Sequence, residues 1–280
     1  MLRRAGLRCA VLGRPVGHSL SPVLHRAAYE VLGLDWSYDA VEVDADGLAG
    51  FLAGLDETWR GLSLTMPLKR RVMALLGPRD QVDRWASLAE AANTLVLGER
   101  RLAANTDVPG AVAALGSRVD GPVGRAVVLG GGATAGSVLL ALAETGCPRA
   151  TLLVRDPARA REAVAAAARH PAGIAVEVGR LGDVVAGTVD LLVSTIPVAA
   201  QTPELVGAWS AVPAVFEVVY DTWPTPLAAA ALADGRTLVS GLDLLVAQAA
   251  LQVQLMTGAE EVPVAAMRAA GERALALRSG

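Results

Sequence analysis

The segment that most restricts the fold is an apolar run that ends in three consecutive glycines. Residues 126–129 read Ala-Val-Val-Leu, and residues 130–135 read Gly-Gly-Gly-Ala-Thr-Ala. Glycines at 130 and 132 with a small residue at 135 fit the pattern G-x-G-x-x-G/A, in which a strand turns tightly into a helix whose N-terminus binds a pyrophosphate. We therefore expect a dinucleotide-binding loop here. Its cofactor-binding residues are expected to be Gly130, Gly131, Gly132, Ala133, Thr134 and Ala135.

The glycine loop lies within a regular succession of apolar runs. Strands are expected at 126–130, 150–154, 174–178, 189–193, 214–218 and 237–240. Helical or loop segments separate them, as in a doubly wound, parallel, Rossmann-like sheet. Upstream, we expect strands at 7–13, 36–43 and 61–65, helices near 22–32, 45–55 and 81–91, and a hairpin of 94–97 with 101–104. This alternation predicts a further α/β domain.

The tip of the second Rossmann strand selects the cofactor. An acidic residue there accepts the ribose hydroxyls of NAD, whereas arginine pairs with the 2′-phosphate of NADP. Arg155 and Arg159 follow that strand and favour NADP. Asp156 could favour NAD instead, but an aspartate directly before a proline is also an ordinary helix N-cap. We prefer the N-cap interpretation and expect NADP.

A length of 280 residues favours two domains of unequal size. We assign residues 107–242 to an NADP-binding, Rossmann-like domain and residues 1–106 to a substrate-binding catalytic domain. Amphipathic helices at about 243–257 and 263–277 have no strand partner left in the second domain. We therefore expect residues 243–280 to return and complete the first.

The composition excludes several classes of partner. The net charge is −3 and basic residues are interspersed with acids, so nucleic acid is not expected. The basic start lacks an apolar core of signal-peptide length, and glycines interrupt the uncharged span 126–143, so neither secretion nor a membrane span is expected. Cys9 and Cys147 have no cysteine or histidine at metal-ligand spacing. They are expected to be core residues of a cytoplasmic protein without a metal.

The use of lysine and asparagine is unusual. Lys69 is the only lysine among 25 basic residues, and Asn93 and Asn105 are the only asparagines, each within the tetrapeptide Ala-Ala-Asn-Thr. A compositional pressure toward arginine spares a lysine where chemistry forbids the exchange, since lysine can release a proton in proteins and arginine does not. These three residues are therefore candidate functional residues, although chance survival is the alternative.

Two hydroxyl side chains flank Leu20 at the junction of a strand and a helix. Ser19 and Ser21 would line a helix N-terminus, which suits a carboxylate. Ser21 is also a candidate N-cap, and His18 a solvated turn residue, so both interpretations stay open. Lys69 follows the end of another strand, and such strand ends are where α/β sheets bind ligands.

Together these motifs resemble the shikimate dehydrogenase family, from the first strand to the last helices. In the first half, residues 18–22, 61–69, 93–95 and 105–107 are similar to H-S-L-S-P, G-x-N-V-T-x-P-x-K, N-T-L and N-T-D. In the second half, residues 130–135, 154–159, 220–227 and 241–249 are similar to the glycine loop, N-R-T-x-x-R, Y-x-P-x-x-T-P-L and G-x-x-M-L-x-x-Q-A. The resemblance implies reversible NADPH-dependent reduction of 3-dehydroshikimate to shikimate, on the pathway to chorismate and the aromatic amino acids.

The resemblance also implies roles for individual residues. The catalytic residues are Lys69 and Asp107. The substrate contacts are Ser19, Ser21, Thr65, Asn93, Asp107, Tyr220 and Gln248, with the two serines at the carboxylate and Asn93 and Asp107 at the ring hydroxyls. Val218 and Gly241 are expected to join Arg155 and Arg159 at the cofactor.

The expected chemistry needs a proton donor. Hydride transfer to a ketone builds negative charge on oxygen, so a group at hydrogen-bond distance must supply a proton and take it back in the reverse direction. Lys69 is the candidate, with Asp107 orienting it and binding an adjacent hydroxyl. Asp107 could instead be only the N-cap of the helix that begins there.

Some positions depart from the family pattern. Ser63 and Val154 replace asparagines, Val108 with Pro109 replaces a glycine-rich step, and Glu217 stands where aspartate is frequent. A relative that oxidises quinate or an amino analogue of shikimate is therefore an alternative, and so is a catalytically silent ligand sensor. Retention of Lys69 with Asp107 favours an enzyme over a sensor. The expected partner is a small-molecule substrate, and the protein is expected to be a monomer or a homodimer.

Overall fold

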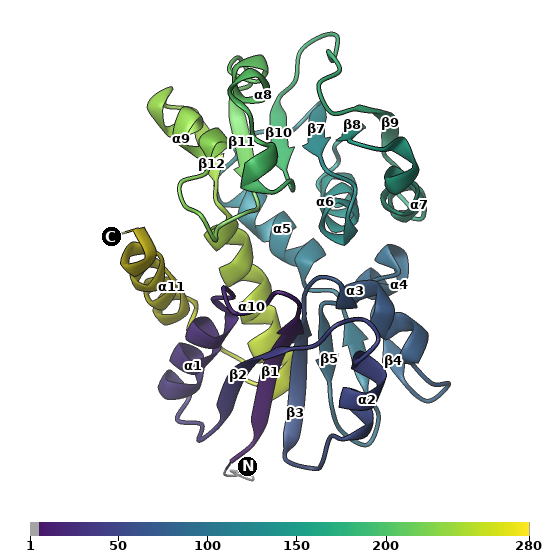
Figure 1. Ribbon diagram of the computed structural model, residues 1–280, viewed down its shortest axis with the longest axis vertical. Helices are drawn as coiled ribbons and strands as arrows, with labels where there is room; N and C mark the ends of the chain where they lie inside the picture. Colours follow the sequence, from purple (N-terminus) through teal and green to yellow (C-terminus); the bar gives the residue numbers. More distant parts are fainter. Residues whose placement is uncertain (1–5, 280) are drawn as a thin grey trace. The chain divides into compact units, whose positions relative to one another are not determined.

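The structure is a computed structural model that describes residues 6–279. The chain forms two compact units (Figure 1). The first holds the residues up to Thr106 together with Leu245–Arg278, and the second holds Asp107–Leu244. Both units are α/β, and the C-terminal helices belong largely to the first. The fold class expected from the sequence is therefore confirmed.

The first unit has a mixed sheet of strand order β2-β1-β3-β5-β6-β4. Its strands are β1 (Arg8–Gly13), β2 (Ser37–Glu42), β3 (Trp59–Leu64), β4 (Gln81–Val82), β5 (Thr94–Val96) and β6 (Leu102–Ala104). Its first helices are α1 (Ser21–Val31), α2 (Leu48–Ala53), α3 (Leu68–Arg71), the 3₁₀ turn η1 (Val72–Leu75) and α4 (Arg84–Ala89). The predicted hairpin is confirmed, because β5 and β6 pair antiparallel.

The predicted start of one helix in this unit is wrong. The helix expected near 81–91 starts only at Arg84, and the two residues before Asp83 form the edge strand β4, parallel to β6. Asp83 divides the two elements because its carboxylate accepts the Ala86 N–H at 2.6 Å and so caps α4. This N-cap sets the start of the helix.

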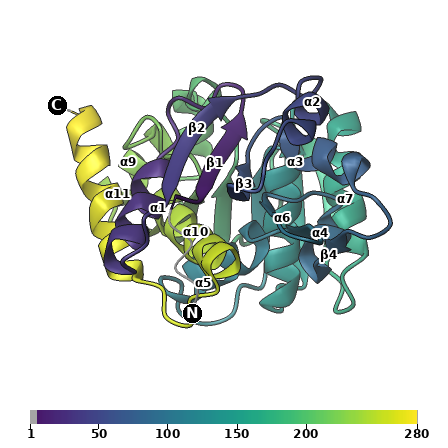
Figure 2. The same cartoon turned by 90° about the horizontal axis from the view of Figure 1, so that it is seen from below.

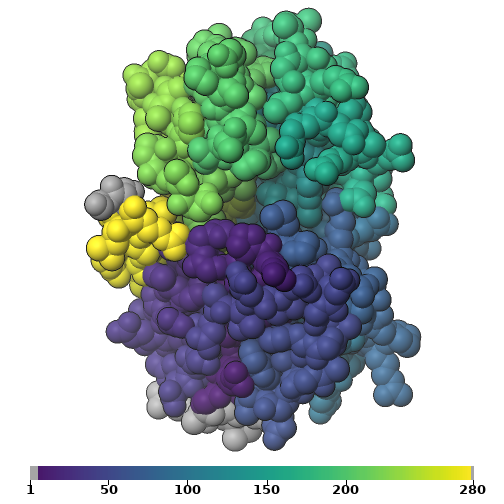
Figure 3. Space-filling model, in the orientation of Figure 1, coloured from purple at the N-terminus to yellow at the C-terminus, as the bar shows by residue number. Residues whose placement is uncertain are grey.

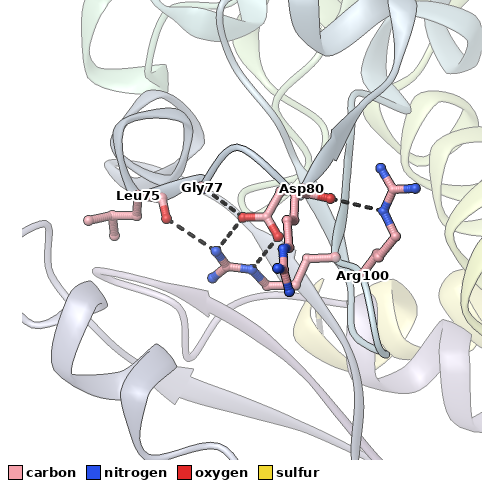
Figure 4. Close-up of polar contacts among 6 residues, drawn as sticks. Leu75, Gly77, Asp80 and Arg100 are labelled. Carbon is pink, nitrogen blue, oxygen red and sulfur yellow. Dashed lines mark hydrogen bonds and ion pairs between the residues drawn. The ribbon is translucent and has the colours of Figure 1, made fainter.

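The loop after η1 is held by its own Asp80 and by the two arginines that precede β6, Arg100 and Arg101 (Figure 4). Asp80 accepts the Gly77 N–H at 2.7 Å and the Arg101 Nε–H at 3.0 Å, and Arg101 also donates to the Leu75 carbonyl at 3.3 Å. Arg100 donates to the backbone of the same loop at 3.0 Å. The hydrogen bond from Arg101 lowers the pKa of the Asp80 carboxyl. These contacts fix the loop between η1 and β4.

The C-terminal helices α10 (Gly241–Thr257) and α11 (Val264–Ser279) pack within the first unit. A Cβ at Gly61 in β3 would lie 2.6 Å from the Met256 side chain, so α10 approaches the sheet closely at a glycine. Helix α11 lies beside α1 (Figures 1 and 2), where Arg278 donates to the His18 carbonyl at 2.9 Å. The space-filling view (Figure 3) shows the yellow atoms of α11 against the purple N-terminal segment.

The second unit has a parallel sheet of order β12-β11-β10-β7-β8-β9, the Rossmann arrangement. Its strands are β7 (Ala126–Leu129), β8 (Arg149–Val154), β9 (Ala175–Arg180), β10 (Leu191–Ser194), β11 (Ala214–Glu217) and β12 (Thr237–Val239). Its helices and 3₁₀ turns are α5 (Asp107–Gly116), α6 (Ala133–Glu144), η2 (Pro157–Ala160), α7 (Arg161–Ala168), η3 (Val198–Ala200), α8 (Pro203–Ala208) and α9 (Pro226–Ala233). Strands β7 and β10 are wholly buried, as expected of a sheet covered on both faces.

Two further observations concern the whole of the described chain. Cys9 and Cys147 are free and buried, which confirms that they are core residues. Among residues 6–279 we find no helix long and apolar enough to cross a membrane, and no cluster of three or more potential metal ligands.

Candidate active site

The two serines expected at the substrate carboxylate lie at the start of α1. Ser21 is the first residue of the helix, and the N-cap position belongs to Leu20, so the N-cap predicted for Ser21 is wrong. The N-cap makes no side-chain capping hydrogen bond, but just before the helix the Ser19 Oγ accepts the Ser21 N–H at 3.2 Å. Ser21 is 5% exposed, and Ser19 is half-buried.

Sequence reasoning missed a buried histidine in the same helix. His25 Nδ1 lies 2.8 Å from the Ser21 carbonyl oxygen, which can only accept, so Nδ1 carries the proton. The ring stacks on Tyr38 with centroids 3.9 Å apart. Burial lowers the pKa of His25 to about 4, so the ring is neutral at physiological pH. His25 thus supports the carbonyl of a predicted substrate residue.

Lys69 lies in α3, which begins four residues after the last residue of β3. The Thr65 side chain packs closely against Gly13, the last residue of β1. A Cβ at Gly13 would lie 2.2 Å from the Thr65 Cγ2. The Thr65 carbonyl accepts the Leu68 N–H at 2.7 Å, and the Lys69 carbonyl accepts the Ala92 N–H at 2.8 Å. The structure therefore joins the backbone of the sole lysine to the residue before Asn93.

The two asparagines have different environments. Asn93 is 2% exposed, and its Nδ2 donates to Thr106 Oγ1 at 2.9 Å and to Gln248 Oε1 at 3.2 Å. Asn105 donates to the Ala91 carbonyl at 2.9 Å and is fully buried, so it holds the segment between β5 and α4. Of the candidate pair, Asn93 therefore meets another predicted substrate residue, and Asn105 has a structural role.

The remaining substrate candidates, Asp107 and Tyr220, belong to the second unit. Asp107 is the first residue of α5 and is 7% exposed. Tyr220 follows β11 in a segment anchored by Glu217. The Glu217 carboxylate accepts from Gln201 Nε2 at 2.7 Å, from Thr225 Oγ1 at 2.9 Å and from the Val219 N–H at 3.1 Å. Burial raises the pKa of Glu217.

The glycine loop has the geometry that a phosphate needs. Gly130 has φ +106°, and a Cβ there would lie 2.3 Å from Thr195 Oγ1, so only glycine fits the turn. A Cβ at Gly131 would lie 3.0 Å from the Arg159 carbonyl oxygen. A Cβ at Gly132 would have no described atom within 4 Å, which leaves the start of α6 open to a ligand.

The segment that follows β8 resolves one alternative. Asp156 is the N-cap of η2 and accepts the Ala158 N–H at 3.0 Å, as the N-cap interpretation predicted. Arg155 and Arg159 are exposed beside it. A Cβ at Gly131 would also lie 2.9 Å from Val154 Cγ1, so the valine that departs from the family pattern packs on the loop.

The fold and these groups define a class: a two-unit α/β oxidoreductase that combines a Rossmann-type nucleotide loop with a unit carrying a lysine and buried amides. Two family descriptions match the chain. They are the shikimate dehydrogenase substrate binding domain, over residues 11–95, and the shikimate 5′-dehydrogenase C-terminal domain, over residues 241–270.

Similar proteins of known sequence or structure agree. The chain is 38% identical to a shikimate dehydrogenase (NADP(+)) of Moorella thermoacetica, covering 97% of this chain and 94% of that protein. Its sequence is 36% identical to that of Mycobacterium tuberculosis shikimate dehydrogenase. The crystal structure of that protein matches with a TM-score of 0.85, covering 95% of this chain and 99% of that one. A Thermus thermophilus shikimate 5-dehydrogenase in complex with NADP(H) and shikimate has 33% identity and a TM-score of 0.82, covering 96% and 99%. The chain therefore belongs to the shikimate dehydrogenase family.

Proposed function

We propose that the chain catalyses the reversible NADPH-dependent reduction of 3-dehydroshikimate to shikimate, on the route to chorismate and the aromatic amino acids. One cluster carries the proposal. Asn93 and Gln248 face each other across 3.2 Å, and the residue before Asn93 bonds the Lys69 carbonyl at 2.8 Å. Two amides suit ring hydroxyls, and a lysine can exchange a proton with a carbonyl oxygen.

In this proposal each unit has one task. Residues 1–106, completed by the C-terminal residues 243–280, bind the substrate, and residues 107–242 bind NADP. The substrate-binding description of the family domain over residues 11–95 supports this division. The protein acts on a small molecule in the cytoplasm, as a monomer or a homodimer. Light scattering at the concentration of the assay tests the oligomeric state.

The substrate carboxylate would bind at the start of α1. The hydroxyls of Ser19 and Ser21 lie at the N-terminus of an 11-residue helix, where the first main-chain N–H groups and the helix dipole favour an anion. The hydrogen bond between His25 and the Ser21 carbonyl holds this first turn. Thr65 and Tyr220 would add contacts to the ring.

Lys69 would exchange the proton. As the carbonyl carbon of 3-dehydroshikimate receives hydride, the Lys69 ammonium donates a proton to the developing alkoxide. In the reverse direction the neutral amine removes the hydroxyl proton of shikimate. Asp107 would orient the ammonium and accept from the neighbouring ring hydroxyl.

The residues of the second unit fit NADP. The turn at Gly130, the open side of Gly132 and the N-terminus of α6 suit a pyrophosphate. The exposed guanidinium groups of Arg155 and Arg159 suit the 2′-phosphate. Val218 and Gly241 would complete the cofactor site. When bound, the nicotinamide supplies or accepts the hydride.

An initial-rate panel tests the proposal. Shikimate and quinate are each offered with NADP and with NAD, and an amino analogue of shikimate is included. We expect the highest kcat/KM for shikimate with NADP. Preference for quinate or for the amino analogue would establish the corresponding relative, and binding of shikimate without turnover would establish a sensor.

A further inference from the structure

A line of buried polar side chains runs from β2 to Asn93. Tyr38 donates to Ser63 Oγ at 2.6 Å, and Ser63 donates to Gln252 Oε1 at 2.8 Å. Gln252 Nε2 donates to Thr94 Oγ1 at 3.0 Å, and Thr94 donates to Asn93 Oδ1 at 2.9 Å. All five side chains are at most 4% exposed. Water therefore does not compete for these hydrogen bonds.

Two main-chain groups decide which atom of each amide faces which neighbour. The Thr106 N–H can only donate, and it lies 2.8 Å from Asn93 Oδ1, so the oxygen of that amide is on this side. The Asn93 carbonyl can only accept, and it lies 3.2 Å from Gln252 Nε2. The Gln252 oxygen therefore faces Ser63, and every hydroxyl in the line has one possible direction.

Gln248 is oriented in the same way. Its Nε2 donates to the Leu245 carbonyl at 3.1 Å, so its Oε1 faces the Nδ2 of Asn93. Asn93 thus presents a donor and Gln248 presents an acceptor. The two groups bond each other at 3.2 Å, and both also contact Thr106 Oγ1, at 2.9 and 3.3 Å. A substrate group that replaces their mutual bond must accept one hydrogen bond and donate another. A hydroxyl does both, whereas a keto oxygen lacks the donor and an ammonium lacks the acceptor.

We infer that Tyr38, Ser63, Gln252 and Thr94 are positioning residues that fix the Asn93 amide, and that they make one ring position of the substrate selective for a hydroxyl. The inference rests on the proposed function, because it takes Asn93 and Gln248 as substrate ligands. Ser63, which departs from the family's asparagine, suits the line because one hydroxyl can accept and donate at once.

The test compares two substitutions at one position. Thr94→Val keeps the volume and removes the hydroxyl, whereas Thr94→Ser keeps the hydroxyl. For each we measure kcat/KM for shikimate and for analogues that lack one ring hydroxyl at a time. The Thr94→Val variant should lose roughly three- to tenfold of its discrimination at a single ring position, the worth of one hydrogen bond. The loss should lie in KM, since the contact exists before the reaction begins.

The controls separate positioning from structural support. Thr94→Ser should keep the discrimination of the wild type. Thr151→Val removes a similarly buried hydroxyl from β8 in the second unit and should leave it unchanged. If Thr94→Val does not fold, Gln252→Met breaks the line one residue earlier, with the same expected loss.

Two results would overturn the inference: unchanged discrimination in a folded Thr94→Val variant, whatever its melting temperature, or an equal loss at every ring position. Failure of the proposed function looks different. In that case the wild type itself would not oxidise shikimate, whereas failure of the inference leaves an active wild type with insensitive variants.

Discussion

Gly241 and Val218 approach each other so closely that a Cβ at position 241 would lie 2.4 Å from the Val218 carbonyl oxygen. Val218 is itself held, because its N–H donates to the Ser194 carbonyl at 3.0 Å. Because the neighbouring atom belongs to the main chain, it cannot move away from a Cβ as the end of a flexible side chain could. The glycine that opens α10 therefore has a steric reason, in addition to its proposed place at the cofactor.

We predict that Gly241→Ala destabilises the protein by roughly 1–3 kcal/mol, the usual cost of overpacking, and weakens NADP binding. Denaturant unfolding and a cofactor titration measure the two effects. Gly207→Ala in α8 is the matched control, because a Cβ there would meet no described atom within 4 Å. Equal stability of the two variants would contradict the steric argument.

Ser19→Ala should raise the KM for shikimate and also lower stability. The Ser19 hydroxyl accepts the Ser21 N–H at the start of α1, so its loss should cost about 1 kcal/mol, the usual net worth of one hydrogen bond. Thr202→Ala removes the N-cap hydroxyl of α8, which also accepts a main-chain N–H, in the second unit and should leave KM unchanged. An unaltered KM in Ser19→Ala would locate the carboxylate elsewhere.

Arg155→Ala should weaken NADP much more than NAD. A charged hydrogen bond to the 2′-phosphate is worth roughly 1.5–3 kcal/mol, and NAD lacks that phosphate. Dissociation constants for both cofactors measure the difference. Arg149→Ala, at the opposite end of β8, is the control and should affect neither. Equal losses of NADP and NAD affinity in Arg155→Ala would exclude this arginine from the phosphate site.

Local signals predicted the second unit well. The glycine loop and its strand are contiguous in sequence, and the φ of Gly130 and the N-cap at Asp156 follow from near neighbours. The line from Tyr38 to Asn93 could not be predicted, because its residues come from elements that are distant in sequence and come together only in the folded protein. These elements are β2, β3, β5 and α10. Ser63 was recognisable as a departure, yet Gln252, which gives it a partner, lies 189 residues away.

Prediction from local sequence also failed where two residues of the same type were candidates for the same role. Ser21 precedes a proline as an N-cap does, but Ser21 is already the first residue of the helix, and Leu20 takes the N-cap position without a side-chain cap. The Ser21 N–H instead donates to the Ser19 hydroxyl. Asn93 and Asn105 each lie in a copy of the tetrapeptide Ala-Ala-Asn-Thr, yet Asn93 donates to Gln248 of α10 and Asn105 donates to the Ala91 carbonyl. In both cases tertiary contacts decide between equivalent sequence signals.

His25 should make stability depend on pH. Its pKa is about 4 in the folded protein, below the ordinary 6.5, so the unfolded chain binds more protons between these values. Stability from this group is complete above pH 6.5 and falls by up to roughly 1.4 kcal/mol per pH unit as the pH drops toward 4. His25→Phe keeps a ring against Tyr38 and should flatten the profile in that window. Denaturant melts between pH 4 and 7 measure it, and parallel profiles for wild type and variant would contradict it.

Lys69→Arg uses the composition of the chain as its own control. Elsewhere the protein meets its need for positive charge with arginine, so this exchange would be harmless if only charge mattered at position 69. Arginine keeps the charge but does not release a proton, and its planar group differs in shape from an ammonium. We expect kcat to fall roughly 10²–10⁴-fold, the usual worth of a positioned acid or base, in a folded protein that still binds NADP. Steady-state rates beside a melting curve measure this, with the exposed Arg79→Lys as the reverse exchange that should change neither. A Lys69→Arg enzyme with near wild-type turnover would show that the sole lysine is not the proton donor.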